Sequence, residues 1–317
     1  MGPFFIRRLG QSILLLFIVS IVGFSILNLA PGGPMSAYNV NPSLSEVERD
    51  RIAEEMGLSD PLPVQYIRWA SGLASGDWGT SFRDSQPVTS IVMSRIPATF
   101  ELMLTSVSIA ATFGVLIGVL GAMKKNSIFD YLATIGAMVA LSIPTFWFGL
   151  MVIFFFSVEL GWLPSGGRST IGGDGSLGDH VRHLIGPASV LALVTVAIWS
   201  RYSRSSVIDA LNQDYIQTAR AKGITERRVI VVHAMRNAVL PLVTLAGIQL
   251  PSLFGGALVA ETVFSWPGMG RLFLDSLSYR DYPVLMGILM ATAFLVILGS
   301  LIADMLYALV DPRIRLN

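Results

Sequence analysis

Long stretches of apolar residues without a single charged side chain recur along the chain and predict membrane-spanning helices. A helix needs about 20 mostly apolar residues to cross about 30 Å of hydrocarbon. None of the stretches shows the two-residue alternation of barrel strands. Six windows meet this length and predict six spans: residues 9–30, 102–123, 131–158, 184–200, 237–260 and 282–303.

The first window has one alternative interpretation, as a secretory signal peptide. Arg7 and Arg8 precede it, as basic residues precede the apolar part of such a peptide. However, the window is longer than that apolar part usually is, and Ala30 is followed by Pro31 where a cleavage site would be needed. We therefore expect an uncleaved first helix.

The windows divide the chain into a first helix (1–30), a long segment (31–97), a core (98–310) and a short tail (311–317). A connection as long as 31–97 is expected to carry structure of its own. Ser43 and Glu46 predict a capping box for a short helix that ends at Gly57, and a second helix is expected over 64–73. The segment is either a lid or a docking surface for an external partner, and the two roles are compatible.

Basic residues in the connections predict the orientation. Lys and Arg accumulate on the cytoplasmic side of short membrane loops. Six spans place both termini on one side, which carries thirteen basic residues against four in the short loops opposite, so both termini are predicted to be cytoplasmic. The four are Arg168, Arg182, Arg271 and Arg280.

Composition removes several classes of protein. Hydrophobic residues make up 53% and charged residues 14%, which is too apolar for an ordinary cytosolic enzyme or a disordered protein. With 22 Lys and Arg against 21 Asp and Glu there is no basic surplus for nucleic acid. No cysteine is present, so disulfides, thiolate nucleophiles and cysteine–zinc sites are excluded.

The predicted cytoplasmic loop 201–236 has the signals of a short, well-delimited helix over 213–222. Asn212 is expected to cap it, Gly223 to end it in the left-handed conformation, and Thr225 to cap the next helix. Ile216 and Ala219 give it a small apolar face. Such a helix either stays solvated or fits a groove that approaches closely at Ala219.

Chemistry-bearing residues are few. No P-loop or H-E-x-x-H motif is present, which argues against an enzyme, and we predict no catalytic or metal-ligating residue. His180 and His183 lack a third metal ligand, and we expect a solvated polar loop over 159–183. Four acidic residues near the windows are expected to be structural, the first three reaching lipid headgroups: Glu101, Asp130, Glu261 and Asp304.

The cytoplasmic loop also resembles a known motif. Its residues look like the EAA loop of ATP-binding-cassette (ABC) importer permeases, and more closely like the dipeptide, oligopeptide and nickel branch. It departs from the general pattern, because the usual Glu is Gln217 and the first Ala is Thr218. The matching run is Gln217-Thr218-Ala219-Arg220-Ala221-Lys222-Gly223, followed by His233-Ala234-Met235-Arg236-Asn237 and Pro241.

Other stretches extend the resemblance over the whole chain, and the long loop after the first span is similar to the first (B-type) of two paralogous permeases. They are Arg7-Arg8-Leu9, Pro31-Gly32-Gly33-Pro34, Gly76-Asp77-Trp78-Gly79 with Ser81, Arg95-Ile96-Pro97-Ala98-Thr99, the run from Glu261 through Trp266 to Gly270, and Asp311-Pro312-Arg313.

The resemblance implies an all-α, six-span type I importer permease in the inner membrane of a prokaryote. It implies a second permease as partner, two cytoplasmic ATPases that hold ATP and Mg, an external binding protein, and no cofactor in this chain. Peptides are the expected cargo, with nickel complexes, glutathione-like peptides, sugars or opines as alternatives. Residues expected to couple to the ATPases are Asp214, Gln217, Thr218, Ala219, Arg220, Ala221, Lys222 and Gly223; those expected at the binding-protein face or external gate are Trp78, Trp266 and Arg271.

Two rival interpretations need no ATPase. A secondary transporter or channel would carry paired intramembrane charges or an inverted repeat, and neither is evident. A membrane scaffold would have no use for the motif-dense loop 201–236.

Overall fold

The computed structural model describes residues 2–29, 33, 35, 45–55, 57–173, 175–249, 251 and 257–310. Within these ranges the fold is helical, and the only strand-like pairing is one isolated bridge between Thr80 and Pro87. The Asp311–Arg313 motif and most of the Pro31–Pro34 motif lie outside them. The long helices are α1 (Gly2–Leu29), α5 (Val88–Met123), α6 (Ile128–Ser142), α8 (Leu177–Leu211), α11 (Met235–Gln249) and α14 (Tyr282–Val310).

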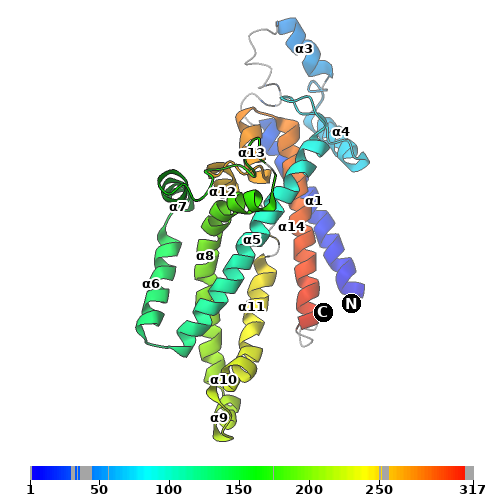
Figure 1. The fold of residues 1–317 in the computed structure, drawn as a ribbon. Coiled ribbons are helices and arrows are strands. Elements are labelled where there is room, and N and C mark those ends of the chain that lie inside the picture. Colours follow the sequence, from blue (N-terminus) through cyan, green and yellow to red (C-terminus); the bar gives the residue numbers. More distant parts are fainter. Residues whose placement is uncertain are drawn as a thin grey trace.

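Short helices lie at both ends of this bundle (Figure 1). The start of α1 and the end of α14 point toward the end that carries α9 and α10, and α3, α4 and α13 lie toward the opposite end. The short helices are α3 (Glu46–Glu55), α4 (Leu62–Ser75), α7 (Thr145–Val152), α9 (Asp214–Ala221), α10 (Glu226–Arg228), α12 (Leu258–Val263) and α13 (Met269–Ser278), with π-helical turns at Ile153–Glu159 and Val229–Ala234.

Four of the six predicted spans are single helices that are long and apolar enough to cross a membrane. The other two correspond to helix pairs that are bent at a short break. The window 131–158 bends by 104° between α6 and α7, where Ile143 adopts the extended conformation that a following proline favours. The other bent pair, Glu226–Val239 and Pro241–Gln249, bends by 45° at Pro241, inside the window 237–260.

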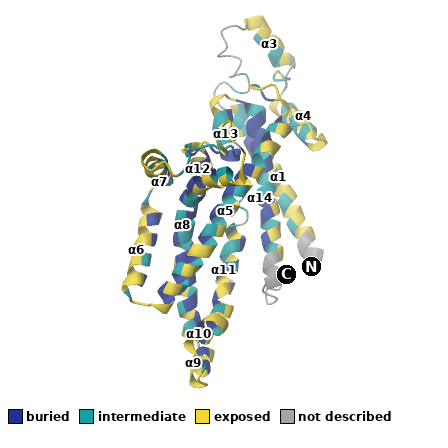
Figure 2. Cartoon of the chain, in the orientation of Figure 1, coloured by how far each residue is buried: buried dark blue, intermediate teal, exposed yellow. Residues whose placement is uncertain are grey.

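The closest packing joins α5 to α8. Small residues recur every four positions on the buried face of α5, at Ser106, Ala110, Gly114 and Gly118. A Cβ atom at Gly118 would lie 2.6 Å from the Cβ of Ser203, so the two backbones approach as only glycine allows. Figure 2 shows that buried residues gather along α5 and α8, whereas α1 and α6 are largely exposed. We therefore treat α5 and α8 as one rigid pair.

The segment before α5 contains both expected short helices. The capping box lies two residues later than expected, because the hydroxyl of Ser45 accepts from Glu48 N–H (3.3 Å) and the Glu48 carboxylate accepts from Ser45 N–H (2.9 Å). This backbone hydrogen bond lowers the pKa of Glu48. Gly57 follows in the left-handed conformation, as expected, and α4 confirms the second helix.

Candidate functional site

Helix α9 lies at the tip of α8, at the end of the bundle (Figure 1), and confirms the helix expected over 213–222. The expected cap was wrong: Asn212 ends α8, and Gln213 takes the N-cap position of α9 without a side-chain bond. Thr225 does occupy the N-cap position of α10, also without a side-chain bond. The turn between α8 and α9 is therefore only two residues long, which ties their directions together.

The apolar face of α9 is buried against its own chain. Ile216 is fully buried and Ala219 is 6% exposed, in a cluster with residues of α5, α8 and the chain that follows α10. The expectation that Ala219 leaves room for a partner's close approach is thus corrected. An eight-residue helix is marginal alone and needs its apolar stripe packed to persist. The partners in the cluster are Ala122, Val207, Ala210, Val229, Ala234 and Ala238.

Polar contacts fix α9 further. Asn237 on α11 donates to the Tyr215 hydroxyl (2.7 Å). Arg220 donates to Glu226 at 3.0 and 2.5 Å, and these bonds raise the pKa of Arg220. Gly223 has φ +73°, and its N–H donates to the Arg220 carbonyl (2.9 Å), which confirms it as the helix stop.

What remains open to a partner is the outward face of α9. Its side chains are polar or small, and the Arg220 guanidinium already has a partner in this chain. The exposed members of the predicted coupling set are Asp214, Gln217, Thr218, Arg220, Ala221, Lys222 and Gly223.

At the opposite end of the bundle, the segment 261–271 is fastened to α5 by buried polar groups. The indole N–H of Trp266 donates to the Ala98 carbonyl (2.8 Å), and the ring is fully buried. Glu261, also fully buried, accepts from the Thr99 hydroxyl (2.7 Å) and from Arg271 N–H (3.0 Å) at the start of α13. Trp266 therefore belongs to the core rather than to a docking surface, and Glu261 does not reach headgroups.

The other two residues expected at the external face differ from Trp266. Trp78 is half-buried and packs against a cluster that includes Val88 and Val284. The Arg271 side chain is 38% exposed and donates to the Ser265 carbonyl (2.6 Å). Only part of each side chain thus faces outward.

The sequence alone did not predict the hydrogen bonds that join residues 81–82 to Asp281. The Ser81 hydroxyl donates to Asp281 (2.5 Å), and Phe82 N–H donates to the same carboxylate (3.2 Å). Arg83 lies over the ring of Tyr279, 3.8 Å from its centre. Ser81 was noticed as part of a motif, but a carboxylate 200 positions away cannot be paired with it from one sequence.

The remaining acids pair with basic side chains of the same chain. Asp130 is buried and accepts from Arg204 (2.6 and 2.8 Å), so its predicted contact with headgroups was wrong. Asp304 pairs with Arg8 (3.2 Å). Glu101 accepts from Arg168 (2.8 Å) and from His180.

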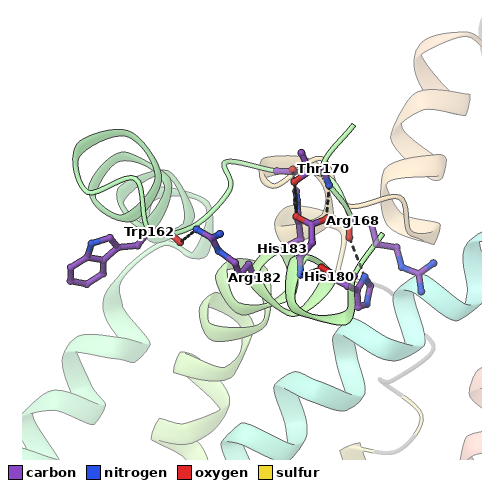
Figure 3. A network of polar contacts seen from close by, with 9 residues as sticks. Trp162, Arg168, Thr170, His180, Arg182 and His183 are labelled. Carbon is purple, nitrogen blue, oxygen red and sulfur yellow. Dashed lines mark hydrogen bonds and ion pairs between the residues drawn. The ribbon is translucent and has the colours of Figure 1, made fainter. Parts of the chain in front are cut away.

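The two histidines do not lie in a solvated loop. His180 and His183 belong to the first turns of α8 (Figure 3). His183 is buried. The expectation of a solvated loop up to 183 fails because α8 begins at Leu177. In the parts of the chain that the structure describes, no three acidic or histidine side chains are placed to hold a metal ion.

Two family descriptions together cover nearly the entire chain. The description "Binding-protein-dependent transport system inner membrane component" matches residues 114–316, and the N-terminal description of the same membrane component matches residues 1–103. The chain belongs to this family of inner membrane transport components. The apolar helices of the fold agree with a multi-pass protein of the inner membrane.

Relatives of this transport component match it end to end. The oligopeptide transport system permease AppB of Bacillus subtilis is 46% identical, over 99% of this chain and 100% of that protein. The dipeptide permease DppB of Escherichia coli K12 is 38% identical, with 99% of each chain covered. The inward-facing methionine ABC transporter MetNI shares the fold, with TM-score 0.56 and 18% identity over 70% of this chain and 97% of that one.

Proposed function

We propose that this chain is a permease subunit of an ATP-driven importer of dipeptides and oligopeptides, and the first of two paralogous permeases. The end-to-end similarity to proteins named as peptide permeases carries this proposal. A second permease completes the pathway, an external binding protein delivers the peptide, and two cytoplasmic ATPases hold ATP and Mg. The chain itself catalyses no reaction.

In this proposal each bent helix pair counts as one span, which gives six, and both termini are cytoplasmic. The common direction of the α1 start, the α14 end and α9 supports it (Figure 1), as does the accumulation of basic residues on that side. The chain contains no cysteine, so single thiols report sidedness cleanly. A cysteine at Ser85 is expected to react with an impermeant reagent from outside, and one at Ser206 only after the membrane is opened; the reverse pattern contradicts the orientation.

Helix α9 acts here as a coupling helix. Closure of the ATPases on ATP moves a groove, and a partner seated in that groove transmits the motion only if it is rigid. The buried Ile216 and Ala219 supply the rigidity, because they lock α9 to α8. The outward residues Gln217, Thr218 and Ala221 contact the groove, and the α5–α8 pair carries the motion toward the segment 261–271. Alternating access follows from that motion.

At the other end, α3, α4 and α13 form the face on which the binding protein docks. This assignment rests on their position opposite α9 (Figure 1). Cargo is then chosen mainly by the binding protein, while the permease accepts what is delivered.

An uptake experiment tests the proposal. A strain without this gene is complemented with the wild-type chain or with an empty vector, and uptake of a labelled dipeptide, a labelled pentapeptide and nickel is measured. We expect peptide uptake to depend on the chain and to stop when ATP is depleted. Nickel uptake alone, or peptide uptake that survives ATP depletion, contradicts the proposal.

A further inference from the structure

A loop of residues 164–173, called the outer loop here, is held in place by two histidines that no step of the proposed transport cycle uses. The outer loop lies against the first turns of α8, and Figure 3 shows His180 and His183 directed toward it. Gly167 N–H also donates to the Phe264 carbonyl (2.8 Å), which joins the outer loop to the segment before α13.

Both ring nitrogens of His180 face groups that only accept. Nδ1 lies 3.1 Å from the Arg168 carbonyl oxygen. Nε2 contacts Oε1 of Glu101, whose other oxygen accepts from the Arg168 guanidinium (2.8 Å). An ion pair of this kind favours the ionised carboxylate. A neutral imidazole has one donor and one acceptor, so it can satisfy only one of these contacts, whereas an imidazolium satisfies both.

Both ring nitrogens of His183 also face oxygen atoms that act as acceptors. Its Nδ1 lies 3.0 Å from the Gly166 carbonyl oxygen, which only accepts. Its Nε2 lies 3.3 Å from the Thr170 hydroxyl. That hydroxyl has one proton and donates it to Asp179 (2.5 Å), so toward His183 it acts as an acceptor. Both nitrogens of this buried ring must therefore donate.

We infer that His180 and His183 are both imidazolium ions when the outer loop is seated, and that together they fasten the loop in a protonation-dependent way. Loss of either proton leaves a ring nitrogen lone pair facing an oxygen lone pair. The seated loop is thus favoured at low pH, and its hold weakens as pH rises through the range in which histidine changes charge.

The charged side chains that contact the two rings are carboxylates. Glu101 on α5 and Asp179 on α8 contribute the negative charges. Arg168 on the outer loop and Arg182 on α8 are positive, but Arg168 is paired with Glu101, and Arg182 turns away to donate to the Trp162 carbonyl (2.9 Å; Figure 3). The ring of Trp266 lies 6.0 Å from that of His180, between centres, and adds no charge.

Release of the outer loop would uncover Trp266 and the segment that fastens α13 to α5. The consequence for transport, a change at the external gate, rests on the proposed function. The protonation of the two histidines does not depend on the proposed function. It can therefore be tested without measuring transport, and the result is independent of peptide uptake.

Hydrogen exchange of the full-length chain, in its assembled complex in lipid nanodiscs, tests the inference. Gly167 N–H and Thr170 N–H are bonded only while the loop is seated, to Phe264 and Asp179 respectively. After correction for the intrinsic rate, we expect peptides covering 164–173 to lose about tenfold protection or more between about pH 5.5 and about pH 8.5. Protection that is flat across this range overturns the inference.

Variants make the result specific. His180→Gln and His183→Gln are expected to show the low protection of the high-pH state at every pH. His180→Arg, which donates at all pH values, is expected to reduce the pH dependence. His233→Gln on the cytoplasmic side is the matched control, as the third histidine of the chain, and is expected to behave as wild type. An equal loss of protection in His233→Gln would show that the effect does not come from His180 and His183, and would contradict the inference. If a variant fails to assemble, the pH dependence of the wild-type chain alone tests the inference.

Discussion

At one end of the α5–α8 pair, helix α9 is held mainly by an apolar cluster. At the other end, buried hydrogen bonds of Glu261 and Trp266 add to the apolar packing of the segment 261–271, and the outer loop is held by hydrogen bonds and a part-exposed ion pair. Apolar packing is insensitive to pH and tolerates little change of volume. A buried hydrogen-bond network stabilises the structure only while every donor in it has an acceptor. Under the proposed function, the packing around α9 suits the transmission of force, and the polar contacts at the opposite end suit holding or releasing a segment.

The largest expected effect comes from breaking the apolar end with a charge. Ala219→Arg places an unpaired guanidinium at a site that is 6% exposed, and we expect α9 to leave its seat and peptide uptake to fall by at least about tenfold. The level of the chain in the membrane should be kept. Ala221→Arg is the matched control on the exposed side of the same helix; equal losses from both variants would show that the buried contact is not what matters.

Next in size is a change at the polar end. Glu261→Ala leaves the Thr99 hydroxyl and Arg271 N–H without their acceptor. Each unsatisfied buried donor lowers the free energy of unfolding by about 1–3 kcal/mol. We expect the purified permease to aggregate at a distinctly lower temperature. Glu159→Ala, at an exposed position, is the control. If both variants aggregate at the wild-type temperature, the carboxylate does not hold this end together.

A smaller effect is expected at the stop of α9. Gly223 has φ +73°, so Gly223→Ala costs about 1–2 kcal/mol in that conformation. Uptake should fall several-fold, and Gly223→Asn should fall less because asparagine tolerates left-handed backbone. The control is Gly178→Ala within α8. Wild-type uptake in Gly223→Ala would show that the exit angle of α9 is not critical.

The smallest effect is expected from the exposed ion pair beside α9. Arg220→Gln and Glu226→Gln both break it, and an exposed pair contributes about 0–1 kcal/mol. Stability should hardly change in either variant. If Arg220 also contacts an ATPase, uptake falls in Arg220→Gln but not in Glu226→Gln. Equal uptake in the two variants would show that Arg220 contacts only its own chain.

Sequence reasoning found the apolar spans, the position of α9 and the stop at Gly223, because these depend on local composition and on backbone conformation. It missed the 104° bend at Pro144, although a proline inside a window is a local signal, because membrane helices often accommodate proline without a sharp bend. The expected side-chain cap at Asn212 failed since α8 simply continues to Leu211.

The contacts of the site could be predicted from the sequence less well than the fold. Ala219 and Trp266 were expected to face partners, and both are buried in this chain. A short apolar stripe looks the same whether its own chain or a partner covers it. The bonds from Thr99 to Glu261 and from His180 to Glu101 join residues 162 and 79 positions apart, so they appear only once the chain is folded.

Site-specific cross-linking tests the central claim, that α9 presents its outward face to the ATPases while its inward face is locked to α8. Single cysteines at Gln217, Ala221 and Ala219 are introduced into this cysteine-free chain, and the intact complex is treated with a short thiol-to-amine cross-linker. The account predicts cross-links to a P-loop ATPase from positions 217 and 221, and none from the buried position 219. Cross-links to ATPase from 219 but not from 217 or 221, or from none of the three, would contradict it.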